Sequence, residues 1–360
     1  VAQQLPYPIY PLALGDTTPQ KDLGIQSIKH NEIVLKGNEF QSVFSISAKA
    51  QDPVFTQYFL VPESLNPGFT GFMETTNIGL LHRTQWPDLN FKVDTEYAFY
   101  NTWLDEMNSG VGISVLNHRE NYTNYNFTQV NLNYAYRVQL NDDWYFRPAL
   151  EIGFGNKTYG FQNIILSDQI NIYSGIISPN SNETLPLRDK VTFFDFSSGM
   201  LFNSENSWVG LSLKHLNKPN ISFSTIGNVP LGTFLSISAG REVILSDYFY
   251  SSFSDDTKLL LTANYMQQAE YNRLDLGTGL VFKNIFWGAT AALHPQKRVD
   301  ESHFLTSVNV FGGLRFDHFK FGCSYDFNTS NIGKTGGVYE LSITYQLDLD
   351  AKCFGCPNYY

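Results

Sequence analysis

The sequence lacks most of the features that mark the common classes of protein. Its 360 residues include only three cysteines, too few for a disulfide scaffold. No stretch approaches the roughly 18 consecutive apolar residues that a transmembrane helix needs. Charged residues are only 16% of the chain, the net charge is -10, and the longest basic group is Lys297-Arg298. Because phosphate binding needs a clustered basic face, nucleic acid is excluded as a partner.

Catalytic motifs are also missing. The seven histidines lie far apart and form no H-E-x-x-H or H-x-H group. The chain contains no G-x-S-x-G, no G-x-x-x-x-G-K, and no G-x-G-x-x-G between a strand and a helix. Gly110-Val111-Gly112 and Gly277-Thr278-Gly279 fall inside strand patterns, where glycines mark kinks or small positions facing a lumen. We therefore expect a protein that is not an enzyme and that has no cofactor or bound metal.

Aromatic residues and alternating patterns dominate what remains. The chain has 29 Phe, 21 Tyr and 5 Trp. Between Asn126 and Leu140, apolar side chains alternate with polar ones, and residues 338–347 repeat the pattern. Alternation gives a strand one apolar and one polar face. These runs reach about 10 to 15 residues, against about 5–6 for an ordinary strand and about 9–11 for a membrane strand. The pattern favours a transmembrane β-barrel over a secreted sandwich or propeller.

The whole prediction is an all-β, antiparallel, up-and-down barrel of about 14 strands with a non-barrel N-terminal extension. The expected strands begin near Thr75, Phe91, Ser109, Asn126, Asp143, Lys190, Asn206, Leu231, Asp256, Tyr271, Ile285, His303, Phe319 and Gly336. An even number of strands places both termini on one side of the membrane, which we expect to be the periplasmic side of a bacterial outer membrane. The long connections Phe161 to Asp189 and Asn217 to Pro230 then lie at the cell surface. Most connections on the other side are tight, except Ile244 to Asp255.

The alternation also predicts which charged side chains face the lumen. Charges of both signs on an inner wall usually form ion pairs that brace or fill it, and the alternative is a channel lining that sets selectivity. The predicted lumen set is Arg83, Arg137, Arg147, Glu151, Asp195, Arg273, Asp275 and Arg315.

The chain divides into four parts. Residues 1–50 form a Pro-rich extension of unclear origin, which ends in an Ala48-Lys49-Ala50 group typical of signal cleavage sites. Residues 51–73 contain three prolines, which cannot donate to a strand ladder, so this segment is expected on the periplasmic side or threaded into the lumen. Residues 74–347 form the barrel. In the tail, residues 348–360, Cys353 and Cys356 form a possible disulfide.

The segment at 51–73 closely resembles the start of mature PorP/SprF family proteins. The family pattern is Gln-Asp-Pro, an aromatic-Ser/Thr-Gln-Tyr block, and Asn-Pro-small-aromatic-x-Gly. It matches Gln51, Asp52, Pro53, Phe55, Thr56, Gln57, Tyr58, Asn66, Pro67, Gly68, Phe69 and Gly71. Further similarities follow in order, including Arg83-Thr84-Gln85-Trp86-Pro87, and the resemblance spans roughly residues 51 to 347.

The resemblance implies a non-enzymatic outer-membrane protein of the type IX secretion and gliding machinery. Its implied partners are secreted surface proteins, such as gliding adhesins, that carry a C-terminal sorting domain, together with subunits of the secretion apparatus. The expected function is to bind such a cargo and help export it or retain it at the cell surface. The alternatives are a core apparatus component that contacts periplasmic partners, and a porin-like or hydrophobic-solute channel.

Overall fold

The computed structural model describes residues 52–89, 92–160, 188–245, 257–295, 304–329 and 335–348, together with Gln169 and Ser178. The predicted N-terminal extension, Gln51, and the tail cysteines Cys353 and Cys356 lie outside these residues. Most of the predicted long connection at 161–189 also lies outside them.

Fifteen strands account for most of the described chain. They are β1 (Asn77–Gln85), β2 (Val93–Leu104), β3 (Ser109–Glu120), β4 (Tyr125–Tyr136), β5 (Val138–Gln139), β6 (Tyr145–Thr158), β7 (Lys190–Asn203), β8 (Ser207–Lys214), β9 (Phe234–Ile244), β10 (Thr257–Gln268), β11 (Tyr271–Phe282), β12 (Ile285–Leu293), β13 (Leu305–Phe316), β14 (Phe319–Asn328) and β15 (Val338–Gln346). Three single 3-10 turns are described: η2 (Pro62–Ser64), η3 (Pro67–Phe69) and η4 (Asp105–Met107). No helix among the described residues is long and apolar enough to cross a membrane.

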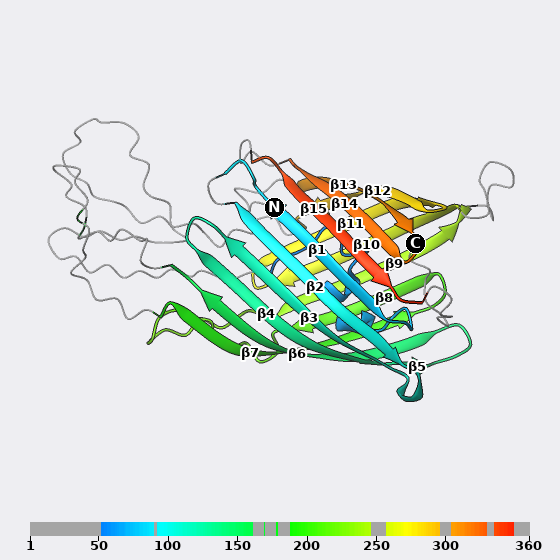
Figure 1. Cartoon of the computed structure of the whole chain (residues 1–360), viewed down its shortest axis with the longest axis horizontal. Coiled ribbons are helices and arrows are strands. Elements are labelled where there is room, and N and C mark those ends of the chain that lie inside the picture. The colour runs from blue at the N-terminus through cyan, green and yellow to red at the C-terminus, as the bar shows by residue number, and fades with distance from the viewer. Residues whose placement is uncertain are drawn as a thin grey trace.

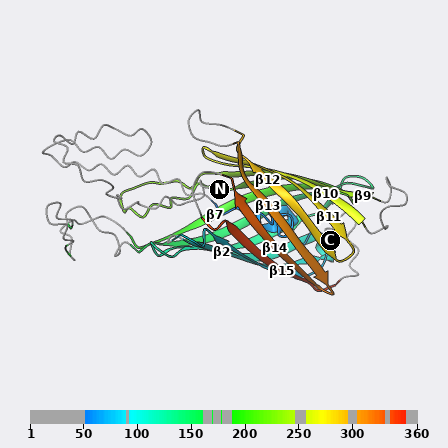
Figure 2. The same ribbon diagram turned by 90° about the horizontal axis from the view of Figure 1, so that it is seen from above.

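The strands close into an antiparallel barrel. Each strand pairs with the next along the chain, except that β4 pairs with β6 and not with β5. The barrel closes where β1 pairs with β15, from Asn77↔Gln346 to Gln85↔Val338. The two-residue β5 pairs only with the edge of β6, so fourteen strands form the wall. Figures 1 and 2 show the tilted strands running side by side around the barrel. The predicted fold class is therefore confirmed.

The predicted strand starts agree closely with the observed ones. All fourteen lie within three residues, and the largest difference is Leu231 against Phe234 at the start of β9. Alternation succeeds because each strand has one face toward lipid and one toward the lumen. In β4, for example, Leu132 and Tyr134 are exposed while Asn131 and Asn133 are buried.

The outward faces carry a nearly continuous apolar surface. Exposed aromatic and aliphatic side chains occur on almost every wall strand. In water such an area would be a strong liability, whereas in a bilayer it is the expected lipid-facing band of a β-barrel. The band includes Ile78, Leu80, Tyr100, Ile113, Val130, Leu132, Leu150, Ile152, Phe154, Phe194, Phe196, Val209, Ile237, Leu261, Leu276, Trp287, Val310, Phe321, Tyr339, Leu341 and Ile343.

The two ends of the barrel differ in their connections. The turn end carries the connections 105–108, 137–144, 204–206, 283–284 and 317–318, with the start of β1 and the end of β15. The loop end carries the connections 159–189 and 215–233, with the short link Ala269-Glu270 between β10 and β11. The loop end is at left in Figure 1.

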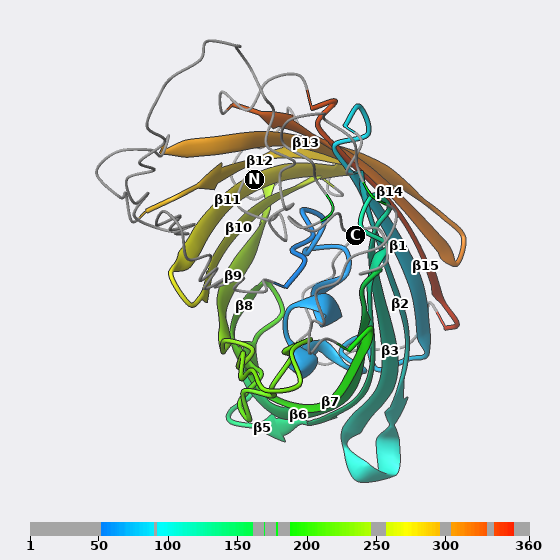
Figure 3. The same ribbon diagram turned by 90° about the vertical axis from the view of Figure 1, so that its left-hand side faces the viewer.

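Residues 52–74, called here the luminal segment, run through the inside of the barrel (Figure 3, blue). The segment begins at the loop end, where the backbone N–H of Asp52 donates to Gln268 at the end of β10. It finishes at the turn end, where Glu74 contacts Arg137 just after β4. Asp52 and Asp348 therefore lie at opposite ends of the barrel, although β1 begins and β15 ends on the same side.

Candidate functional site in the barrel lumen

The start of the luminal segment is held by a histidine between two carboxylates. His215 follows β8 directly, and its Nε2 lies 2.7 Å from Asp52 Oδ2. Its Nδ1 lies 2.7 Å from Asp195 Oδ2 on β7. Burial alone lowers the pKa of His215, but the charge of Asp52 and the hydrogen bonds to both carboxylates outweigh it and raise the pKa to about 10. The imidazolium therefore joins the segment to the wall through two charge-assisted hydrogen bonds.

The next turn of the segment is bound by Glu340 on β15. The backbone N–H groups of Thr56 and Gln57 donate to Glu340 Oε1 and Oε2 at 2.8 and 2.9 Å. Arg83 Nη1 on β1 donates to the same carboxylate at 2.6 Å. The Thr56 hydroxyl donates to Asp326 on β14 at 2.8 Å. All of these groups are buried, so the contacts are shielded from water and cannot be replaced by it.

The Gln57 side chain continues this network on the same two strands. Its amide nitrogen donates to Ser324 Oγ at 3.1 Å and to the Glu340 carbonyl at 3.0 Å. Its amide oxygen accepts from Ser342 Oγ at 2.7 Å. A fully buried glutamine with its amide satisfied on both sides fixes the position of the backbone that carries it.

Asn66 performs the same task on the opposite wall. Its side-chain oxygen accepts from the N–H of Gly68 at 2.8 Å and so caps the turn η3. Its amide nitrogen donates to the carbonyls of Met200 on β7 and Leu211 on β8 at 3.1 and 3.3 Å. The Asn-Pro-Gly part of the family pattern therefore forms a capped turn that is hydrogen-bonded to the barrel wall.

Two arginines hold the end of the segment. Arg147 on β6 donates to the carbonyls of Gly71 and Phe72 at 3.4 Å. Its guanidinium lies 5.0 Å from the ring centre of Phe72 and 3.4 Å from Glu74. Arg137 also donates to Glu74. Cation–π and ionic contacts thus fix the end of the segment at the turn end of the lumen.

Glycines in the wall make room for the segment. A Cβ atom at Gly110 would lie 2.0 Å from the carbonyl oxygen of Thr70, and one at Gly199 would lie 2.2 Å from Asn66 Oδ1. At Gly322 it would lie 2.6 Å from Gln57 Oε1. Three separate strands therefore lack side chains where the segment touches them, and Gly110 is a small lumen position of the kind the sequence indicated.

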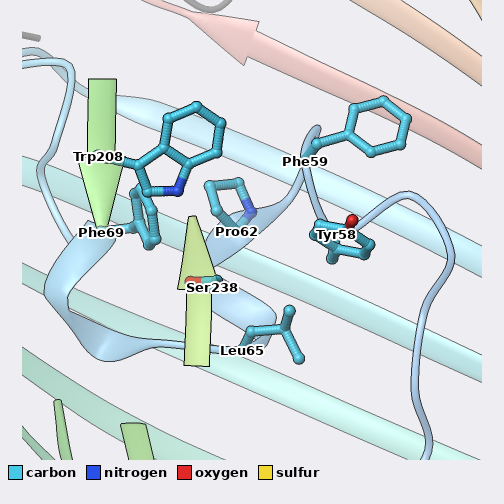
Figure 4. A pocket seen from close by; sticks show the side chains of 7 residues that line it. All are labelled: Tyr58, Phe59, Pro62, Leu65, Phe69, Trp208 and Ser238. Atoms are coloured by element: carbon cyan, nitrogen blue, oxygen red, sulfur yellow. The ribbon is translucent and has the colours of Figure 1, made fainter. Parts of the chain in front are cut away.

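Apolar and aromatic contacts also hold the segment against the wall. The Phe59 ring lies 4.3 Å from Phe311 on β13, and Phe55 lies 6.0 Å from Tyr97 on β2. A cavity between the segment and β8–β9 measures about 10 Å³, close to the minimum for a single water. Figure 4 shows its lining, to which the wall contributes Trp208 and Ser238. This cavity is too small for an organic ligand.

The predicted lumen set lies on the inner side of the wall or at its rim, and most of its members pair. Arg83, Arg147, Glu151, Asp195 and Asp275 are buried. Arg273 lies 2.7 Å from Asp275, and Arg315 at the turn end is half-buried. Among the described residues, no group of three His, Cys, Asp or Glu side chains is placed to hold a metal ion.

The sequence did not single out two of the principal contacts. The alternation at 338–347 places Glu340 on the polar face of its strand without indicating a partner, and no sequence pattern gives His215 a role. For Glu340 a signal existed, since it is an acid on the inward face of an otherwise uncharged strand. For His215, which lies in a connection, no periodic pattern indicated a partner.

Comparison with known proteins identifies the family. The model of the family described as "Type IX secretion system membrane protein PorP/SprF" matches residues 47–345. None of the curated proteins matches the chain. A Pseudomonas aeruginosa FadL homologue is 11% identical with a TM-score of 0.42, covering 79% of this chain and 93% of that one. The P. putida toluene transporter TodX is 9% identical with a TM-score of 0.45, covering 78% and 92%. The CymD monoaromatic hydrocarbon channel is 13% identical with a TM-score of 0.43, covering 81% and 93%. The chain belongs to the PorP/SprF family of type IX secretion system membrane proteins.

Proposed function

We propose that this outer-membrane barrel binds a type IX secretion substrate through the C-terminal sorting domain of that substrate, and helps to export it or retain it at the cell surface. In this arrangement the loop end faces the exterior, and the start of β1 and the end of β15 face the periplasm. The protein performs no chemical reaction in this role.

One observation carries the proposal beyond family membership. The luminal segment occupies the barrel along its length and is bonded to β6, β7, β8, β10, β14 and β15. A transport channel needs a lumen that solutes can enter, and selectivity groups that face water. Here most of the predicted lumen-facing charged side chains pair with one another or with the luminal segment. A partner protein therefore finds its contacts at the ends of the barrel and not along a pore.

Two measurements on the purified protein test this function. In planar bilayers the wild-type protein should show no steady conductance, and an open pore of constant size would favour the channel alternative. Native purification from outer membranes should recover a cargo with a sorting domain. An intact membrane preparation that repeatedly yields the barrel without any such cargo would overturn the proposal.

A second role, as an apparatus component that contacts periplasmic partners, is favoured by the charge of the turn end. The exposed charged side chains of its described connections are almost all acidic: Asp105, Glu106, Asp142, Asp143, Glu205, Asp317 and Asp348, against Lys283. Cross-linking from position 142 in intact cells distinguishes this role, since a cargo protein contacted at the loop end would not be captured there.

A further inference from the structure

The connection between β8 and β9, residues 215–233, is anchored on the inner wall at the loop end. Ile221 and Leu231 in the connection are buried with Phe127 of β4 and Phe193 of β7. Phe127 and Phe193 are inward-facing residues, and their rings lie parallel at 6.2 Å. The base of the connection therefore covers part of the mouth of the barrel and does not lie along its lipid-facing side.

The connection is also ordered by its own hydrogen bonds. Asn220 Oδ1 accepts from the N–H groups of Ser222 and Val229 at 3.1 and 2.9 Å. The N–H of Ile221 donates to the Val229 carbonyl at 2.9 Å. A surface loop that is already held in one shape loses little conformational entropy when a partner binds it.

A third set of contacts fixes the outer part of the connection to the start of β7. The N–H of Arg188 donates to the Phe223 carbonyl at 2.8 Å, and its guanidinium donates to the Thr225 carbonyl at 3.4 Å. The Tyr159 ring lies 5.9 Å from the Phe223 ring. The backbone that leads to residue 226 is thus held in place by these contacts.

That residue is Ile226, whose side chain is 87% exposed, the largest value among the exposed large apolar side chains of the described chain. Most of the others lie on wall strands, where lipid explains their exposure. Ile226 lies outside the strands, on a connection packed over the barrel mouth, where lipid does not explain its exposure. A rigid, fully presented apolar side chain is the usual anchor of a protein interface.

The exposed charges of this connection and of the described residues just before β7 are opposite to those of the whole chain. Arg188, whose guanidinium reaches the Thr225 carbonyl, Lys190 and Lys218 are exposed, and Asp189 is the one acid among residues 188–190 and 215–233. The chain itself has a net charge of -10, and the connections at the other end are acidic. Complementary charge governs the rate and specificity of association, so this surface fits an acidic partner.

We propose that residues 216–230 form the docking surface for the sorting domain of the cargo. Ile226 inserts into an apolar depression of that domain, and Arg188, Lys190 and Lys218 meet acidic side chains around the depression. This inference rests on the proposed function and names the surface through which that function operates.

The test measures binding of the full-length barrel in detergent to purified C-terminal sorting domains of type IX substrates from the same organism. Two variants alter the surface, Ile226→Asp and Lys218→Glu. Two matched controls alter the turn end, Met107→Asp and Lys283→Glu. Met107 is also exposed and apolar, and both lysines have a positive φ, 44° and 54°, so each pair carries the same change in the same setting. Mobility of the unheated protein in SDS gels verifies that every variant folds.

Ile226→Asp should weaken binding about 10- to 100-fold, the range typical of an interface anchor. Lys218→Glu should weaken it about 3- to 10-fold and reduce its dependence on salt. Both controls should bind like the wild type. If the wild type binds and both surface variants bind equally well, the docking surface is wrong while the function stands. If no sorting domain binds the wild type, the function fails and the surface with it. Binding to vesicles that contain lipopolysaccharide is measured in parallel. If the variants bind sorting domains like the wild type but lose binding to these vesicles, the surface recognises lipid and the inference is overturned.

Discussion

Replacing Glu340 with alanine removes the group that holds the luminal segment most directly. Its carboxylate accepts hydrogen bonds from the backbone of Thr56 and Gln57 and from Arg83, all at 2.9 Å or less. Without it, the Arg83 guanidinium still lies 4.0 Å from the carboxylate of Asp326. Removing one partner of a buried ion pair costs about 3–5 kcal/mol, and two buried N–H groups also lose their acceptor. We expect a loss of about 5 kcal/mol in the free energy of unfolding.

The loss is measured by urea unfolding of the protein in lipid vesicles, followed by tryptophan fluorescence. Glu96→Ala is the matched control, because Glu96 is a half-exposed acid on β2 that lies 3.9 Å from Arg119. It should cost less than about 1 kcal/mol, as exposed ion pairs do. Glu340→Gln keeps an acceptor oxygen and should fall between the two. A loss below about 1 kcal/mol for Glu340→Ala would show that the segment does not depend on this carboxylate.

Three further outcomes follow from the same contacts. Leu132→Arg, on the lipid-facing side of β4, should cost about 2–4 kcal/mol near the bilayer midplane, and a folding titration with no change would place that face outside lipid. Gly110→Ala should destabilise the barrel and admit measurable conductance, because its Cβ meets Thr70 at 2.0 Å, whereas Gly312→Ala, with 3.6 Å of clearance, should do neither. Because the pKa of His215 is raised to about 10 by its carboxylate partners, its contribution to stability is complete below pH 6.5 and is lost as the pH rises to about 10. His215→Gln should flatten this decline in the free energy of unfolding measured from pH 6 to 10, and an unchanged profile would contradict the proposed role of His215 between Asp52 and Asp195.

The wall of the barrel could be predicted from the sequence because its cause is local. Each strand sees lipid on one side and the lumen on the other, so every second residue reports the same environment. The tight turns also leave a signal, as at Lys283-Asn284, where a two-residue polar link separates two alternating runs. These features repeat along the chain, and counting them yields the strand number without any knowledge of the final contacts.

The site in the lumen could not be predicted in the same way. Thr56 bonds to Glu340 across 284 residues, and Asp52 to His215 across 163. Alternation identifies Glu340 as inward but does not say which other inward group it meets. His215 lies where the strand pattern has ended, so nothing periodic marks it. The prolines showed only that the luminal segment stays out of the ladder, which left both the periplasm and the lumen open.

The hydrogen-bonding groups of a polar inner wall need partners, which are water, other wall residues or a plug. Here the luminal segment provides many of these partners. Its N–H groups donate to the Glu340 carboxylate, its Asn66 amide donates to carbonyls of β7 and β8, and its carbonyls at Gly71 and Phe72 accept from Arg147. Every such contact stabilises the barrel and also removes a group that a passing solute would use. His215 belongs both to this network and to the connection that carries Ile226. The luminal segment therefore braces the base of the loop end, where the proposed partner would bind.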